Sequence, residues 1–387
     1  MAVIGTEAWP TWQDRRMAAR VPALTGIRTL AALSVCLTHA AYWTGHYRDT
    51  YEGRLSARFE IGVTIFFVLS GYLLYSTWVG RLRRGPEATP VSVRTYFAHR
   101  ARRVLPAYWL TVVGVYLVFL VRENPTDYGS GWDGFVRHMT FTQVFGLGHQ
   151  HTGLTQMWSM VAEVSFYLVL PPIALLGVAV CRGRWRPDLL LCLLVGVALV
   201  SPLWIFAVVG SDVDLSARIW PPTFFWWFVA GMVLAVCVPL MSRIRTGWWV
   251  VIGAAAFLVS GIGAAGGATM APDTAGQTIV KHILYLVVSL GFIAPLAVVG
   301  ANGGMDWWSR LWASRPTVWF GEISYEFFCV HVIVLEFVMD LLGYRVLATG
   351  STVVAFAVTT AFSIPLAWAL HRVTRPIWRR NSTVATR

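Results

Sequence analysis

The first apolar stretch of the chain, LTGIRTLAALSVCLTHA, carries two side chains that could do chemistry, Arg28 and His39. At about 100° per residue, their spacing is three helical turns plus about 20°, so both would lie on one helix face, about 16 Å apart along the axis. A histidine can take a proton from a hydroxyl near neutral pH, and a guanidinium can bind phosphate. The alternative is structural, with each side chain extending to the nearer membrane interface.

Two arginines and a carboxylate add to this set. Arg100 and Arg103 lie in the segment RARRVLPAYW, three residues apart and so on one helix face. They could clamp phosphate, or they could anchor the cytoplasmic end of a membrane helix. Glu163, in MWSMVAEVSFYLVLPP, is expected at the same membrane depth as His39, where it could orient the imidazole. The alternative for Glu163 is an ion pair with an arginine of another helix.

A segment near the C-terminal end, FGEISYEFFCVHVIVLEF, is unusually rich in ionisable groups for an apolar helix. Its three carboxylates and one histidine predict a polar cavity: Glu322, Glu326, Glu336 and His331. His331 could be a second catalytic histidine or a buried core residue. The pair His149 and His151, with His138 nearby, is too weak a pattern to predict a metal site.

Composition places these groups in a membrane protein. The 387 residues are 56% hydrophobic and 13% charged, with a mean hydropathy of +0.59. Soluble domains have about 45–50% apolar and about 25% charged residues, so a water-soluble enzyme, a disordered chain and a nucleic-acid-binding domain are excluded. The net charge of +12 comes from arginines between apolar stretches, which is typical of cytoplasmic loops. The five cysteines show no spacing for a metal site.

The sequence predicts an all-α polytopic membrane protein with about ten transmembrane helices, because each span needs about 20 mostly apolar residues. The predicted spans are 22–43, 61–80, 104–121, 157–180, 188–210, 221–241, 248–267, 282–301, 318–341 and 351–370. With the N-terminus inside, 22 basic residues fall in cytoplasmic segments and eight in outer ones, so both termini are predicted to be cytoplasmic. The domain organisation is then an N-terminal tail over 1–21, the membrane domain over 22–370 and a basic C-terminal tail over 371–387.

The chain resembles the acyltransferase 3 family, the polytopic membrane O-acyltransferases of bacteria and some animals. Five stretches carry the resemblance in order: Arg28 with ten residues before His39, then GVTIFFVLSGYLL, RARRVLPAYW, MWSMVAEVSFYLVLP and ISYEFFCVH. They extend from residue 24 to residue 331, across most of the membrane domain. Glu326 and Cys329 depart from the small or apolar residues expected in the last motif. This departure bears on which acceptor lines the pocket more than on the class of reaction.

The resemblance implies an enzyme that moves an acyl group, typically acetyl, from acyl-CoA to a hydroxyl. It implies that His39 and Glu163 are catalytic, and that the donor is bound by Arg28, Arg100 and Arg103. Other motif residues would line the pocket: Ser70, Tyr72, Trp158, Tyr325 and His331. Acyl-CoA would be a co-substrate, with no tightly bound cofactor and no metal. The acceptor would be a sugar, a glycan or a glycosylated small molecule such as a macrolide, and the location a bacterial plasma membrane.

Several alternatives stay open at this point. Arg28, His39 and the carboxylates of the FGEISYEFFCVHVIVLEF segment could instead form the proton relay of a secondary transporter or flippase. Within the enzyme class, the donor could carry a longer acyl group such as propionyl or succinyl. Transfer could be direct or pass through an acyl-histidine, and the acceptor, the side of the membrane and the oligomeric state are not specified by the sequence.

Overall fold

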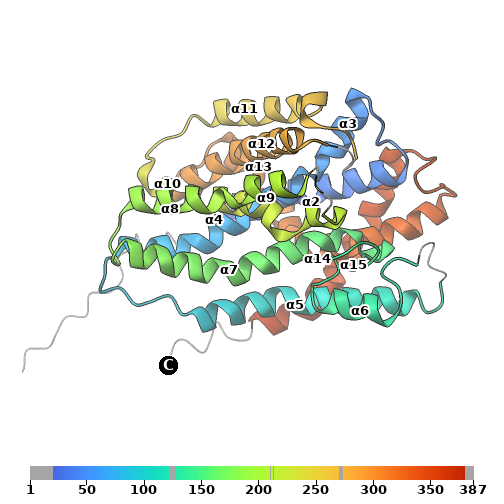
Figure 1. Cartoon of the computed structure of the whole chain (residues 1–387), viewed down its shortest axis with the longest axis horizontal. Helices are drawn as coiled ribbons and strands as arrows, with labels where there is room; N and C mark the ends of the chain where they lie inside the picture. Colours follow the sequence, from blue (N-terminus) through green and yellow to red (C-terminus); the bar gives the residue numbers. More distant parts are fainter. Residues whose placement is uncertain (1–20, 123–126, 210, 212, 270–272, 380–387) are drawn as a thin grey trace, which may run out of the picture.

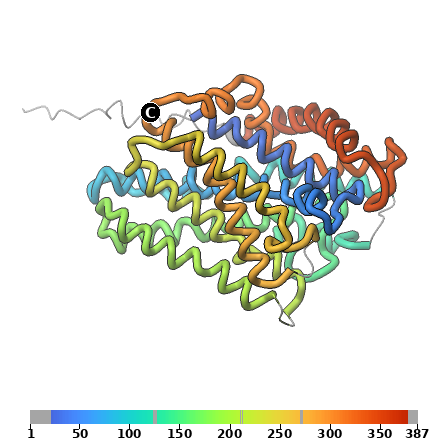
Figure 2. The backbone as a smooth tube through the Cα atoms, turned by 90° about the horizontal axis from the view of Figure 1, so that it is seen from above, coloured from blue at the N-terminus to red at the C-terminus, as the bar shows by residue number. Residues whose placement is uncertain are grey.

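The chain folds into an elongated bundle of helices, seen in a computed structural model that describes residues 21–122, 127–209, 211, 213–269 and 273–379. Over these residues the regular structure is helical throughout, without a strand. In both views the long helices run roughly side by side along the long axis of the bundle (Figure 1, Figure 2). The prediction of an all-α membrane protein is confirmed.

The helices follow the predicted apolar segments closely. The helices that fall within the predicted spans are α2 (Pro22–Trp43), α4 (Ile61–Arg83), α5 (Val93–Val118), α7 (Trp158–Val180), α8 (Pro187–Ala198), α9 (Val200–Val208), α10 (Phe225–Cys237), α11 (Thr246–Val259), α12 (Ala275–Ala301), α14 (Arg315–Leu341) and α15 (Thr352–Arg379). Shorter helices and turns connect them: α3 (Tyr51–Ala57), η1 (Arg58–Glu60), α6 (Gly131–Met139), η2 (Thr152–Met157), η3 (Leu215–Ile219), η4 (Pro221–Phe224), η5 (Val238–Leu240), η6 (Gly263–Ala265) and α13 (Trp307–Trp312).

Eight of these helical segments, within the residues described, are long and apolar enough to cross a membrane. The two other predicted spans correspond to α5 and α11. Helix α5 has the length, with 26 residues, but its first three turns carry four arginines and lower its hydropathy. Helix α11 is apolar but has only 14 residues, shorter than the about 20 that a straight span needs.

Close packing around α2 and α4 depends on glycines. A Cβ added at Gly71 of α4 would overlap the backbone oxygen of Phe228 in α10, and one at Gly231 would overlap that of Val68. A Cβ at Gly321 of α14 would overlap the oxygen of Thr25 in α2. These backbones therefore touch, as small residues allow in membrane helices, and α2, α4, α10 and α14 form a rigid centre.

The end of the bundle at which α4, α7, α10 and α12 begin is called the outer end here, after the orientation that the arginines predict. Helix α12 starts there with a capping box, in which Thr274 and Gln277 exchange side-chain and backbone hydrogen bonds. At the opposite end, α15 continues to Arg379, so the first nine residues of the predicted C-terminal tail are helical. The predicted N-terminal tail lies almost entirely outside the described residues, and the domain bounds stay a prediction.

Candidate active site

The histidine of α2 and the histidine of α14 are hydrogen-bonded to each other. Nδ1 of His39 lies 2.8 Å from Nε2 of His331, and the two rings stack with their centroids 5.0 Å apart. His331 is fully buried, and its Nδ1 lies 2.8 Å from the backbone oxygen of Phe328. The two histidines are 292 positions apart in the sequence, and we call them the histidine pair.

The carbonyl of Phe328 determines which nitrogens of the pair carry hydrogen. A carbonyl oxygen only accepts, so Nδ1 of His331 is the donor and Nε2 is left as an acceptor. His39 must then donate through its Nδ1, which leaves a lone pair on its own Nε2. No group in the described part of the chain is hydrogen-bonded to that nitrogen. The pair therefore presents one neutral imidazole nitrogen that can accept a proton.

The backbone beside His331 is held by a residue that the sequence did not single out. Gln156, in η2 and 1% exposed, donates from Nε2 to the carbonyl oxygens of Cys329, at 2.8 Å, and Phe328, at 3.4 Å. The ring of Phe327 stacks on His331 with the centroids 5.8 Å apart. In the sequence, Gln156 is visible only as a glutamine directly before the MWSMVAE motif, and nothing there indicates that it binds the backbone beside His331.

Glu163 lies elsewhere than predicted. It accepts hydrogen bonds from Ser70 Oγ, at 2.9 Å, and from the Tyr167 hydroxyl, and it interacts electrostatically with Arg28 rather than with His39. The expected place beside His39 came from counting residues from the outer ends of two helices, which assumes that the ends are level. Gly62 of α4 packs against Ala31 and Val35 of α2, so Ser70, eight residues further inward, and Glu163 that it contacts lie deeper than His39.

The three predicted donor-binding arginines converge on the inner half of the bundle and are called the arginine cluster: Arg28, Arg100 and Arg103. Arg28 of α2 lies close enough to both arginines of α5 for their positive charges to repel. The Nε of Arg28 is buried, and no hydrogen-bond partner for it occurs among the residues described. A buried guanidinium donor without a protein acceptor is available to an anion.

Arg103 also joins three helices through a buried carboxylate. Its Nη1 lies 3.0 Å from Oε1 of Glu326 in α14, which is fully buried, and His371 of α15 lies 3.1 Å from the same oxygen. The guanidinium stands 5.6 Å from the ring centroid of Tyr325. Tyr325, a predicted pocket residue, donates from its hydroxyl to the oxygen of Val104, at 3.0 Å. Glu326, which replaces the small or apolar residue expected in the family motif, thus supplies the negative charge that pairs with Arg103.

The remaining predicted residues are distributed over the bundle. Tyr72 is half-buried on α4, one turn before Ser76, whose hydroxyl donates to the Tyr72 carbonyl. The histidines of the HQH motif have different surroundings: His149 lies 3.6 Å from Asp133, while His151 packs against Phe119. Among the residues described, no three metal-ligating side chains come together.

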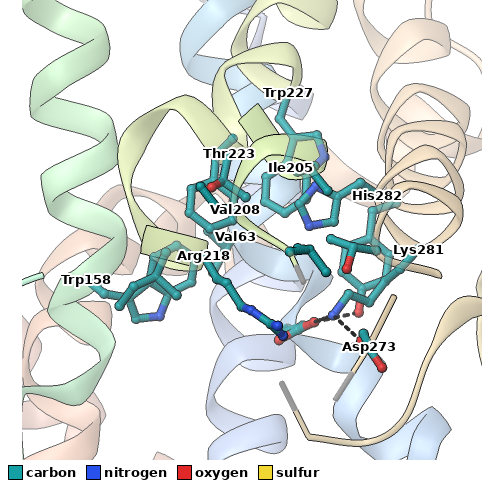
Figure 3. Close-up of a pocket in the computed structure, with 16 residues that line it drawn as sticks. Val63, Trp158, Ile205, Val208, Arg218, Thr223, Trp227, Asp273, Lys281 and His282 are labelled. Carbon is teal, nitrogen blue, oxygen red and sulfur yellow. Dashed lines mark hydrogen bonds and ion pairs between the residues drawn. The ribbon is translucent and has the colours of Figure 1, made fainter. Parts of the chain in front are cut away.

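Trp158 lines a different feature, a cavity at the outer end of the bundle (Figure 3). The cavity is bounded by α4, α7, α9, α10 and α12, and we call it the outer cavity. Aromatic side chains from α7, η4, α10 and α12 line it together with four charged side chains: Glu60, Arg218, Asp273 and Lys281. None of these four was predicted as a site residue, because they come from three separate outer segments.

Comparison with known proteins accounts for the order of these motifs. A family model described as an acyltransferase domain matches residues 21–372, from the start of α2 into the last part of α15. The chain belongs to the acyltransferase 3 family. Residues 21–372 therefore form the acyltransferase domain of an integral membrane protein, and the resemblance proposed from the five motifs is confirmed.

Two relatives illustrate the breadth of the acyltransferase 3 family. The acyltransferase MdmB of Streptomyces mycarofaciens is 26% identical over 346 residues, which cover 84% of this chain and 81% of that protein. The peptidoglycan O-acetyltransferase OatA of Listeria monocytogenes is 29% identical over 209 residues, 50% of this chain but only 30% of that protein. No solved structure matches the chain significantly. The chain thus spans less than a third of the peptidoglycan O-acetyltransferase OatA, and most of the match lies within the acyltransferase domain that the family model identifies.

Proposed function

We propose that this membrane protein transfers an acyl group, with acetyl as the first candidate, from acyl-CoA to a hydroxyl of a sugar, a glycan or a glycosylated small molecule. The observation that carries the proposal is the histidine pair, in which Nε2 of His39 keeps a free lone pair. A base of this kind is what O-acylation requires, because a neutral hydroxyl is a poor nucleophile until its proton is removed.

The arginine cluster supplies a place for the donor. The phosphates of CoA would bind Arg28 and Arg100, with Arg103 held beside them by Glu326. Arg28 and His39 share a face of α2 and are about 16 Å apart along its axis, a gap that the extended pantetheine arm of CoA can span. The thioester would then arrive close to His39 while the phosphates stay at the inner half of the bundle.

The transfer step follows from the protonation of the pair. Nε2 of His39 takes the proton of the acceptor hydroxyl as its oxygen attacks the thioester carbonyl, and the C–S bond then breaks. The imidazolium returns the proton to the departing CoA sulfur, so the enzyme ends as it began. His331 stays neutral throughout, and its Nε2 accepts from Nδ1 of His39 and stabilises the positive charge. An acyl-histidine intermediate would instead use the same Nε2 lone pair as nucleophile.

The first prediction tests this assignment with His39→Gln, which keeps a polar side chain of similar size but has no basic nitrogen. Membranes containing the protein would be supplied with radiolabelled acetyl-CoA and two acceptors, a peptidoglycan disaccharide and a glycosylated macrolide. We expect alkali-labile label in an acceptor with wild type, reduced on the order of 10²–10⁴-fold in His39→Gln. Full transfer by His39→Gln would contradict the proposal, and so would acceptor transport into liposomes without any use of acetyl-CoA.

A further inference from the structure

The outer cavity combines aromatic surfaces with paired charges. Trp158 of α7, Phe224 of η4 and Trp227 of α10 line it with their rings, and the centroid of Phe224 lies 4.8 Å from that of Trp158 and 5.1 Å from that of Trp227. Figure 3 shows Trp158 on one side of the cavity and Lys281 and Asp273 on the other. Flat apolar walls facing hydrogen-bonding groups suit a ligand that has one face of C–H bonds and a rim of hydroxyls.

Lys281 is the central polar group of the cavity. Its Nζ lies 3.7 Å from a carboxylate oxygen of Asp273 and 3.9 Å from one of Glu60, beyond hydrogen-bonding distance in both cases. No hydrogen bond joins the ammonium to any described residue, although its side chain is only 12% exposed. The ammonium thus lies between two carboxylates at the cavity, and this alternation of donor and acceptors can bind neighbouring hydroxyls.

The charges in the cavity balance, which identifies the kind of ligand. Among the described residues that line the cavity, two carboxylates are matched by Lys281 and Arg218, so the lining carries no net charge that would favour a phosphate or an ammonium ligand. His282 adds no charge, because its Nδ1 accepts from the indole N–H of Trp226, at 3.3 Å. A neutral ligand rich in hydroxyls remains.

Two elements connect the cavity to the surroundings of His331. Glu60 and Val63 at the start of α4 line it, and Phe66, one turn further along, contacts the ring of Phe328 beside His331, with centroids 6.5 Å apart. On the second element, Trp158 lines the cavity two residues after Gln156, which holds the backbone of Phe328 and Cys329.

We propose that the outer cavity binds a neutral pyranose ring of the acceptor, which approaches from the outer end while the donor binds at the inner half. This rests on the proposed function. Trp158 and Trp227 would stack on the C–H face of the ring, Lys281 would donate to its oxygens, and Glu60 and Asp273 would accept from its hydroxyls. The pyranose could belong to a glycan or to a glycosylated macrolide, which present the same chemistry.

Equilibrium binding to the full-length protein in nanodiscs tests this directly, without turnover. The probes are a peptidoglycan disaccharide, a glycosylated macrolide and the aglycone of that macrolide. We expect at least one saccharide-bearing probe to bind wild type, the aglycone to bind at least tenfold more weakly than its parent, and Trp158→Ala and Lys281→Met to weaken saccharide binding at least tenfold. The matched controls, Trp248→Ala and Arg345→Met, change exposed residues outside the cavity and should bind like wild type.

Folding of each variant is checked by its thermal stabilisation with CoA, which binds at the opposite half. Wild-type saccharide affinity in both cavity variants would overturn the inference, as would the absence of saccharide binding to wild type. His39→Gln separates the two proposals. If it retains saccharide binding and loses transfer, both stand; if it retains transfer, the proposed function fails while the binding result for the cavity still holds.

Discussion

One backbone carbonyl decides how the two histidines share their protons. Because the Phe328 oxygen requires a donor, His331 turns an acceptor toward His39, and His39 is left with its reactive nitrogen free. In the proposed function, His331 is therefore a positioning residue, which acts through His39 and not on the substrate. Its effect on the reaction depends on the presence of an acceptor atom at the place of its Nε2.

A comparison of two substitutions tests this role. His331→Ala removes the acceptor and should lower kcat by at least about tenfold with little change in the acetyl-CoA KM, since the donor site lies at the other half. His331→Gln offers a side-chain oxygen to Nδ1 of His39 and should recover part of that loss. If the alanine and glutamine variants are equally impaired at equal thermal stability, then His331 serves the packing of α14 and not the orientation of His39.

From its position beside Arg28, we expect Glu163 to affect donor binding, whereas the sequence predicted that it would orient His39. A glutamine side chain in its place could still accept from Ser70 and Tyr167, but Glu163→Gln removes a negative charge from the neighbourhood of Arg28 and Arg100. We expect a lower melting temperature without ligand, because the guanidiniums lose a counter-charge, and a larger stabilisation by CoA, whose phosphates replace it. Thermal unfolding with and without CoA measures both, and an unchanged response to CoA would separate Glu163 from the donor site.

The residue types of the site could be predicted from the sequence, but their partners could not. Arg28 and His39 stand out because charged groups are costly in an apolar helix, and their spacing gives their common face. The contact of His39 with His331, and that of Arg103 with Glu326, join residues more than 200 positions apart. Such contacts depend on which helices lie next to each other. Helical periodicity carries no information about that arrangement.

At the scale of elements, α6 is a short amphipathic helix held against α5 by a buried histidine. His138 is fully buried, its backbone oxygen accepts from the Tyr108 hydroxyl at 2.8 Å, and its Nε2 has no partner in the described structure. Burial lowers the pKa of His138 from 6.5 to about 4, although a hydrogen bond to the Gly134 carbonyl opposes the shift. Protonation of this histidine is therefore expected to weaken the docking of the helix.

The sign of the pH dependence follows from that lowered pKa. The docked state binds fewer protons than the undocked one, so the stabilisation is complete above pH 6.5 and is lost as the pH falls through 4, by about 3 kcal/mol in total. Hydrogen exchange of residues 131–139, corrected for the intrinsic rate, should show protection falling from pH 6.5 to pH 4.5. His138→Gln should flatten this dependence, and an equally steep loss in that variant would assign it to other groups.

Element ends were predicted well where the sequence has a sharp signal and poorly elsewhere. The first span, 22–43, agrees with α2 because Pro22 and the polar residues after Trp43 bound a single apolar run. Helix α5 begins 11 residues before its predicted span, because Ser92 caps a basic first part that hydropathy alone does not register as helix. The depth of Glu163 was misjudged for a related reason, since helix ends are not level across the bundle.

On the scale of the whole molecule, the proposed donor and acceptor regions lie at different heights along one bundle. The arginine cluster lies in the inner half and the outer cavity at the outer end. His39 also lies near the outer end, because Thr38 beside it donates to the carbonyl of Ala57, just before Glu60. The orientation is a prediction from the distribution of arginines, and the proposed function depends on it only for the compartment from which each substrate arrives.

Donor binding tests this arrangement, and the two arginines of α5 should differ. Arg100→Gln should abolish most of the CoA-induced stabilisation, which is about 2.7 kcal/mol for wild type at a hundredfold excess over Kd, without lowering stability in the absence of CoA. Arg103→Ala should also lower the stability of the unliganded protein, by about 3–5 kcal/mol, since it leaves Glu326 buried without its guanidinium. Equal apo stabilities for the two variants would contradict the structural role of Arg103.

Lys281 gives the molecule an unusual chemical property, because it is the only lysine in the sequence. A reagent that modifies primary amines can react at only two places in this chain, the α-amino group and this side chain at the outer cavity. The extent of labelling therefore reports on one site without any mutation or tag. Mass spectrometry of a tryptic or chymotryptic digest would follow whether that amine is shielded, from which face of a sealed vesicle it can be reached, and which compounds protect it.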